Sequence, residues 1–154
     1  MVKHCGWLTI ASLLLVSGCN NPPQSSATPP LSKETAIVLI SVTSDANENP
    51  QSVDMAMKLA GFSLDEGRKV VMFFNVKGVT IPLNKLADDF AFQSNQPLKA
   101  QLTELIKRGV DVHVCPICMK ALSVEKSDLI EGANVTTRPN LFTNIGANTS
   151  VFTY

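Results

Sequence analysis

Short apolar runs alternate with amphipathic stretches over most of the chain, which is typical of an α/β fold. Buried parallel strands read as short continuous apolar runs, and helices repeat apolar residues every three or four positions. The strands are predicted at 35–42, 69–74, 109–114, 135–137 and 150–153. The helices are predicted from Asn49 or Ser52 to Gly67, over Pro97–Arg108, from Pro116 to about Val124 and over Ser127–Gly132. We therefore expect a three-layer α/β/α sandwich with a mostly parallel sheet.

The amino terminus has a different pattern. Lys3 and His4 precede the apolar run Trp7–Val16, which is followed by Ser17, Gly18 and Cys19. This resembles a bacterial lipoprotein signal peptide, and the run is too short to span a bilayer as a mature helix. The resemblance implies that residues 1–18 are removed and that Cys19 becomes a lipid-bearing amino terminus. It also implies export, with anchoring to the outer membrane facing the periplasm if the source is a diderm.

The segment after Cys19 is rich in proline and serine and holds almost nothing that could build a core. We interpret residues 19–34 as a tether between the lipid and a folded part. The remaining residues, 35–154, are enough for one domain with its own core, and they contain no internal repeat.

The charge balance narrows the classes of partner. The chain carries 13 Lys and Arg against 13 Asp and Glu, and no basic cluster stands out. A nucleic-acid-binding surface needs concentrated positive charge, and so does a polybasic membrane site. Neither is supported, so the membrane contact that we expect is the lipid anchor alone.

Cys115 and Cys118 form a C-x-x-C pair where the strand at 109–114 gives way to a helix that Pro116 can open. With Cys19 assigned to lipid, they are the whole thiol inventory of the mature chain. In one interpretation Cys115 is a reactive thiolate that accepts sulfur or attacks a disulfide, and Cys118 resolves the product. In a second, the pair binds a soft metal such as Cu(I), helped by Met119. In a third, the pair has no turnover.

Four further residues are candidates for a pocket around the thiols. His113 shares a strand face with Cys115, because side chains alternate along a strand. Asp45, Asn75 and Lys77 lie in loops that follow predicted strands, where sites of parallel sheets gather. No phosphate-binding glycine loop, H-E-x-x-H motif or G-x-S-x-G motif is present, so no cofactor is predicted.

Four segments carry a resemblance to the DsrE/DsrF-like family: 67–74, 77–79, 105–118 and 128–133. The resemblance implies a small three-layer α/β domain that forms homo-oligomers. In the sulfur-relay members it implies a persulfide-carrying cysteine after a strand, and Cys115 is the position that matches. The sequence thus favours an exported lipoprotein that handles sulfur or thiol redox state with a partner protein. The alternatives are soft-metal binding and a non-catalytic oligomeric binding module, and an enzymatic role is left open.

Overall fold

One parallel sheet organises the residues that the computed structural model describes, which are 35–93 and 95–154. Its strand order is β4-β3-β2-β1-β5, and every neighbouring pair is parallel. The strands are β1 (Ile37–Val42), β2 (Lys69–Phe74), β3 (Asp111–Val114), β4 (Ala133–Val135) and β5 (Thr149–Thr153). The predicted α/β fold is therefore confirmed, and within the described residues the sheet is wholly parallel. The predicted signal peptide, Cys19 and the tether lie outside the described residues and stay predictions.

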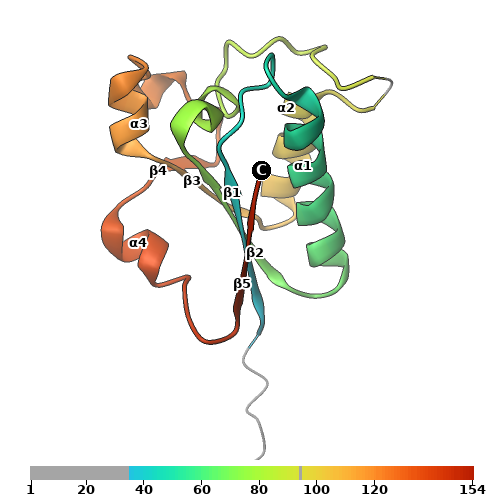
Figure 1. Cartoon of the computed structure of the whole chain (residues 1–154), viewed down its shortest axis with the longest axis vertical. Helices are drawn as coiled ribbons and strands as arrows, with labels where there is room; N and C mark the ends of the chain where they lie inside the picture. Colours follow the sequence, from blue (N-terminus) through green and yellow to red (C-terminus); the bar gives the residue numbers. More distant parts are fainter. Residues whose placement is uncertain (1–34, 94) are drawn as a thin grey trace, which may run out of the picture. The chain divides into compact units, whose positions relative to one another are not determined.

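Helices lie on both sides of the sheet, in three layers (Figure 1). The long helices α1 (Pro50–Asp65) and α2 (Leu98–Lys107) cover one face. The opposite face carries the short helices α3 (Pro116–Ala121) and α4 (Arg138–Phe142). Two 3₁₀ turns, η1 (Val76–Thr80) and η2 (Lys126–Asp128), join these elements. In the part of the chain that is described, no helix has both the length and the apolar character needed to cross a bilayer.

The main core lies between the sheet and the two long helices. Even-numbered residues of the central strands share this face, and Ile40, Met72 and Phe74 are fully buried. On α1 the apolar positions 53, 56, 57 and 60 form one stripe toward the same core. Burying one such large side chain contributes about 1.5–3 kcal/mol, so the layer between α1, α2 and the sheet is the main source of stability.

Helix α1 begins and ends where its flanking residues satisfy the backbone. The Asn49 side chain accepts a hydrogen bond from the Ser52 N–H at 3.2 Å, as predicted for an N-cap, and Pro50 opens the first turn. Gly67 follows the helix with φ of +70°, a conformation that glycine adopts at no steric cost.

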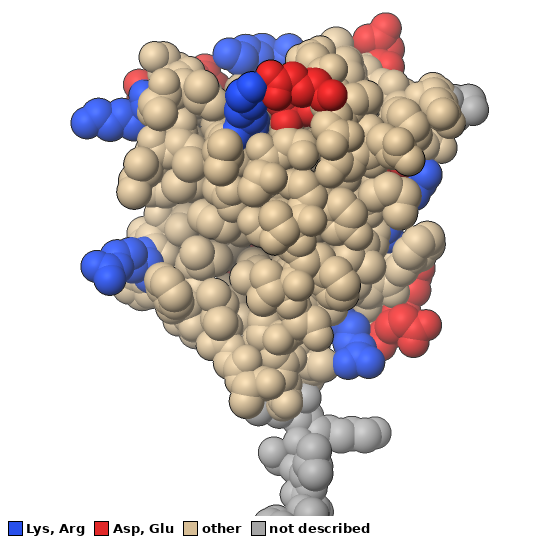
Figure 2. Space-filling model, in the orientation of Figure 1, with Lys and Arg blue, Asp and Glu red and all other residues tan. Residues whose placement is uncertain are grey.

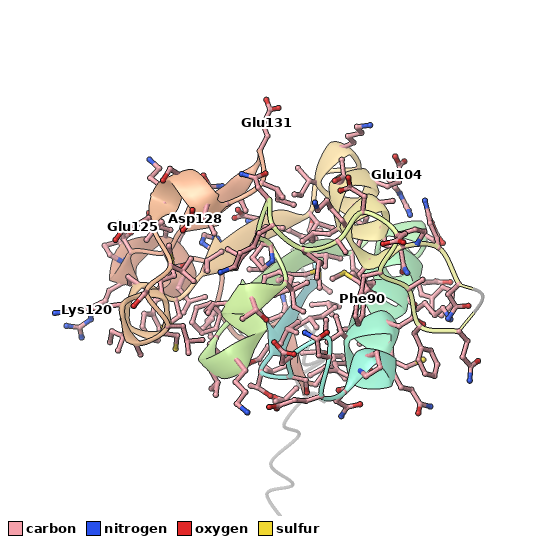
Figure 3. All side chains as sticks on the ribbon, turned by 90° about the horizontal axis from the view of Figure 1, so that it is seen from above. Phe90, Glu104, Lys120, Glu125, Asp128 and Glu131 are labelled. Atoms are coloured by element: carbon pink, nitrogen blue, oxygen red, sulfur yellow. The ribbon has the colours of Figure 1, made fainter. Side chains whose placement is uncertain are left out.

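A buried carboxylate ties α1 to α2 and to the segment before α2. Asp54 is almost fully buried and forms an ion pair with Lys58 at 2.8 Å. It also accepts hydrogen bonds from the side chains of Asn95 and Gln101, at 2.9 and 3.0 Å. Because a buried charge is costly unless it is paired, these partners fix the loop against the helix. Phe90, from the same loop, lies beside α1 and α2 in the view onto the carboxyl ends of the strands (Figure 3).

The sequence patterns did not predict one of the elements, and they placed two others at different residues. Helix α4 was not predicted, because its five residues include no buried side chain and so show no apolar period. The last helical prediction, Ser127–Gly132, is a short 3₁₀ turn at Lys126–Asp128. Strand β4 begins two residues before the predicted 135–137, where it pairs with β3.

Gly78 is packed against the end of β1. Its N–H donates to the Thr43 carbonyl at 3.2 Å, and a Cβ built at this position would lie 2.0 Å from the Val42 carbonyl oxygen. Real Cβ atoms never approach a backbone oxygen so closely, so only glycine fits without a shift of η1.

The Gly78→Ala variant is therefore expected to lower the free energy of unfolding by about 1–3 kcal/mol, the range for overpacking. The matched control is Gly146→Ala, because a Cβ there meets no atom within 4 Å. Its effect should stay within about 0.5 kcal/mol. Urea denaturation of both variants measures the difference, and equal midpoints would contradict the close packing of η1 on β1.

Candidate functional site

The two thiols meet at the carboxyl end of β3. The Cys115 N–H donates to the Phe74 carbonyl at 2.9 Å, which continues the β3–β2 ladder up to the first turn of α3. Cys115 is the N-cap residue of α3, and Pro116 opens the helix. Cys118 follows one turn later, so the C-x-x-C spacing places its sulfur beside that of Cys115. Both cysteines are free thiols and partly buried.

Cys118 is held from outside its own helix. Its Sγ accepts a hydrogen bond from the backbone N–H of Val76 at 3.1 Å. Val76 has φ of +51°, a left-handed conformation that a β-branched residue rarely adopts and that costs about 1–2 kcal/mol. Strain of this kind concentrates at functional sites, because the surrounding structure must hold it in place. The strained turn therefore marks the junction of β2 and α3 as the candidate site.

The environment keeps the Cys118 thiol protonated. Burial raises the pKa of Cys118 above its ordinary value of 9.0, and the hydrogen bond with Cys115 raises it further. The Val76 N–H opposes both effects by stabilising the thiolate, but it does not outweigh them. A thiol that keeps its proton at neutral pH can donate a hydrogen bond to the neighbouring sulfur. The pair is therefore asymmetric, with Cys118 as the poorer nucleophile at neutral pH.

Three of the predicted pocket residues lie around the same edge of the sheet. Asn75 directly precedes the strained turn, and its side chain donates to the Ser41 Oγ at 2.8 Å. Lys77 is exposed and forms an ion pair with Glu48, which raises the Lys77 pKa.

Asp45 accepts hydrogen bonds from the Thr80 hydroxyl and the Asn47 N–H, at 2.8 and 2.7 Å. Burial works against ionisation of Asp45, but these bonds hold its pKa below the ordinary value. Each of these side chains supports a loop, and among the described residues none of the three makes a hydrogen bond or ion pair with a thiol.

His113 lies apart from the thiols. It is buried within β3, and its Nε2 is 3.0 Å from the Asp111 carboxylate. The angle at that contact does not suit a hydrogen bond, so both ring nitrogens stay without one. The predicted strand face shared with Cys115 stays a prediction, because β3 ends at Val114 and Cys115 is already the N-cap of α3. The structure nevertheless brings His113 to a cavity beneath α4, and that cavity is lined by Asp111, Asn134 and Asn144.

Metal ligands are sparse around the pair. No cluster of three or more His, Cys, Asp or Glu side chains that could hold a metal occurs among residues 35–93 and 95–154. Met119, which we considered as a third sulfur ligand, is buried in the hydrophobic core. A soft ion at the cysteines would therefore rely on two thiolates from this chain.

Sequence reasoning missed the residues that position Cys118. Val76 acts through its backbone N–H, and no side-chain pattern reports such a contact. Gly78 could have been noticed in the sequence, because a glycine shortly after a strand is a signal of a turn or of close backbone approach.

Comparisons with known proteins agree with this architecture. A sequence model described as the DsrE/DsrF-like family matches residues 36–153. The crystal structure of the ychN protein from E. coli is similar with a TM-score of 0.62 and 19% identity, covering 78% of this chain and 99% of that one. A protein of unknown function, MTH1491 from Methanobacterium thermoautotrophicum, is similar with a TM-score of 0.58 and 14% identity, covering 79% and 100%. At these identities the two structures show the fold alone. No curated protein matches the chain.

Alkylation kinetics test the asymmetry of the pair. Because the Cys118 pKa is raised, the rate of its alkylation by iodoacetamide, plotted against pH, should have its midpoint above pH 9. Mass spectrometry of the peptides measures the rate at each cysteine separately. In the Cys115→Ala variant the hydrogen bond that raises the pKa is lost, so the midpoint should move to lower pH. A Cys118 midpoint at or below that of an exposed reference cysteine would contradict the assignment.

Proposed function

Because the chain belongs to the DsrE/DsrF-like family, we propose that it handles sulfur or thiol redox state through Cys115, assisted by Cys118. The observation that carries the proposal is the paired thiols at the end of β3, with one sulfur held by the strained Val76 N–H. Structural cysteines are usually inert and fully buried, whereas these two are partly exposed and lie at the carboxyl edge of a parallel sheet.

The proposed chemistry has two steps. In disulfide exchange, the Cys115 thiolate attacks one sulfur of a partner disulfide, a new Cys115–partner bond forms, and the other partner sulfur leaves as a thiolate. Cys118 then gives up its proton to solvent and attacks Cys115, which releases the second partner thiol and leaves a Cys115–Cys118 disulfide. The partner gains two electrons and the pair loses two.

In sulfur transfer, Cys115 instead attacks the outer sulfur of a partner persulfide. The partner leaves as a thiolate, and Cys115 carries the persulfide. In both routes the first nucleophile is Cys115. The exchange route ends with a disulfide between Cys118 and Cys115, whereas the transfer step ends with a persulfide on Cys115.

The surface around the thiols supports a protein as the partner. Ile117, between the two cysteines, is 79% exposed, and Val76 and Leu122 are also exposed apolar residues beside the pair. Exposed apolar side chains around a reactive group favour docking of another protein. In an exported location, which the amino-terminal sequence predicts, the supply of disulfides is high.

Trapping with a model disulfide tests the order of attack. With 5,5′-dithiobis(2-nitrobenzoate), the wild-type chain should end as a Cys115–Cys118 disulfide, whereas Cys118→Ser should keep a stable mixed disulfide on Cys115. Because burial keeps the pKa of Cys118 raised, Cys115→Ser should form its adduct at Cys118 more slowly than Cys118→Ser forms its adduct at Cys115. Peptide mapping by mass spectrometry locates each adduct. A first adduct on Cys118, or no adduct on either cysteine, would refute the proposed roles.

One surface favours the second candidate function, an oligomeric binding module. Figure 2 shows a face over β5 on which charged side chains are confined to the rim. Large apolar residues are exposed there on β5 and on the segment that precedes it: Phe142, Ile145, Val151 and Phe152. Strand β5 is an edge strand with no charged residue, and such an edge can pair with another chain.

We infer from this surface that two copies can join along β5. Even-numbered residues of β5 bond to β1, which leaves the N–H and C=O of Val151 and Thr153 directed away from the sheet. A Val151→Lys substitution should therefore shift the chain toward monomer in sedimentation analysis, since it puts a charge at the centre of the edge. The matched control is Thr103→Lys, on the exposed face of α2, which should leave the mass unchanged. A wild-type chain that is monomeric at about 0.1 mM would exclude the assembly.

A further inference from the structure

Three buried polar atoms on one side of the sheet have no hydrogen-bond partner. They are both ring nitrogens of His113 and the hydroxyl oxygen of Thr136, and no other buried side-chain atom of the described residues is in this state. His113 pairs in register with Asn134, and Thr136 is two residues further on, so the three atoms share one face of β3 and β4. A buried polar atom without a partner costs about 1–3 kcal/mol, so the unbonded ring nitrogens of His113 point to a polar ligand beside that side chain.

A polar cavity lies beside His113, and Thr136 is not among the residues that line it. It has a volume of about 510 Å³ and opens between β3, β4 and α4. His113, which is only 3% exposed, lines it together with an acid, an amine and three amides. These other lining residues are Asp111, Lys126, Asn134, Asn140 and Asn144. The lining is unusual for the face of a parallel sheet, which is normally covered by apolar side chains.

Several lining groups already have partners, which fixes their orientation. Asn144 is buried; its Oδ1 accepts from Lys69 Nζ at 2.5 Å, and its side-chain amide donates to the Asn140 carbonyl at 2.9 Å. The same amide lies 3.5 Å from the Asp111 carboxylate. Asp111 and Asn144 are thus held in place before any ligand arrives, which lowers the entropy cost of binding.

The charges of the cavity select the class of ligand. Lys126 makes no ion pair within the described part of the chain, so its ammonium group can receive an anion. Asp111 is a carboxylate in the same cavity, 3.0 Å from His113 Nε2 and 3.5 Å from the Asn144 side-chain amide. A simple anion would be repelled by Asp111, and a simple cation would be repelled by Lys126. A molecule that carries both charges a few ångströms apart satisfies both groups.

We propose that this cavity binds a free α-amino acid. Its carboxylate pairs with Lys126, its ammonium group pairs with Asp111, and His113 supplies a hydrogen bond from the floor of the cavity. Val135 lines both this cavity and a second groove, which Met119 and Val124 also line. An apolar side chain of the amino acid fits in that groove. This inference goes beyond the proposed function, because none of the groups involved is a thiol.

A titration followed by NMR tests the proposal on the full chain. Glycine, alanine and leucine are added in turn, with acetate and methylammonium as ligands that carry one charge each. The side-chain amide signals of Asn134 and Asn144 should shift and saturate with the amino acids, at concentrations about tenfold lower than with either half-ligand. Absence of saturable shifts, or equal binding of acetate or methylammonium, would overturn the proposal.

Two surface variants separate a specific site from general charge. Lys126→Ala should weaken amino-acid binding about tenfold, because it removes one charge-assisted hydrogen bond. Lys85→Ala is the matched control, since it removes an exposed lysine that does not line this cavity. If both variants bind equally well, Lys126 does not hold the ligand and the proposal is wrong. A His113→Gln variant that still binds as tightly as wild type would also overturn it.

Discussion

The geometry of the thiol pair depends on the close approach of Gly78 to the end of β1. Because no side chain intervenes, η1 lies directly on the Val42 carbonyl, where a Cβ would be 2.0 Å from the oxygen. Only Asn75 separates the end of β2 from the start of η1, and Val76 takes up the strain with φ of +51°. This conformation is what aims its N–H at the Cys118 sulfur. A backbone contact at the end of β1 thus affects the environment of a thiol on α3.

The two faces of the sheet have separate tasks. On β3 the even-numbered residues Val112 and Val114 pack into the core under α1 and α2, and they hold the strand in place. The odd-numbered residues Asp111 and His113 face the side that the short helices cover only in part. Because that side has little apolar cover, it can hold polar groups that a fully packed layer would exclude. The long helices α1 and α2 stabilise the domain. The layer formed by the short helices α3 and α4 leaves space for a polar cavity.

Sequence patterns predicted the elements whose causes are local. Helix α1 was found because Asn49 caps it, Gly67 ends it, and its apolar stripe repeats at helical spacing. The nearness of the two thiols was also predictable, since residues three apart meet on one helical turn. The contact from Val76 to Cys118 was not, because it spans 42 residues and involves a backbone N–H. The setting of His113 depends on Asn144 and α4, which come together only in the folded chain.

The thiol pair and the polar cavity share one strand, and this bears on how the domain can work. Cys115 follows His113 by two residues, so a group bound at His113 lies roughly 7 Å along the strand from the level of Cys115. The thiols nevertheless turn toward η1, since Cys118 is held by Val76, while the cavity opens toward α4. A ligand in the cavity therefore need not touch either sulfur.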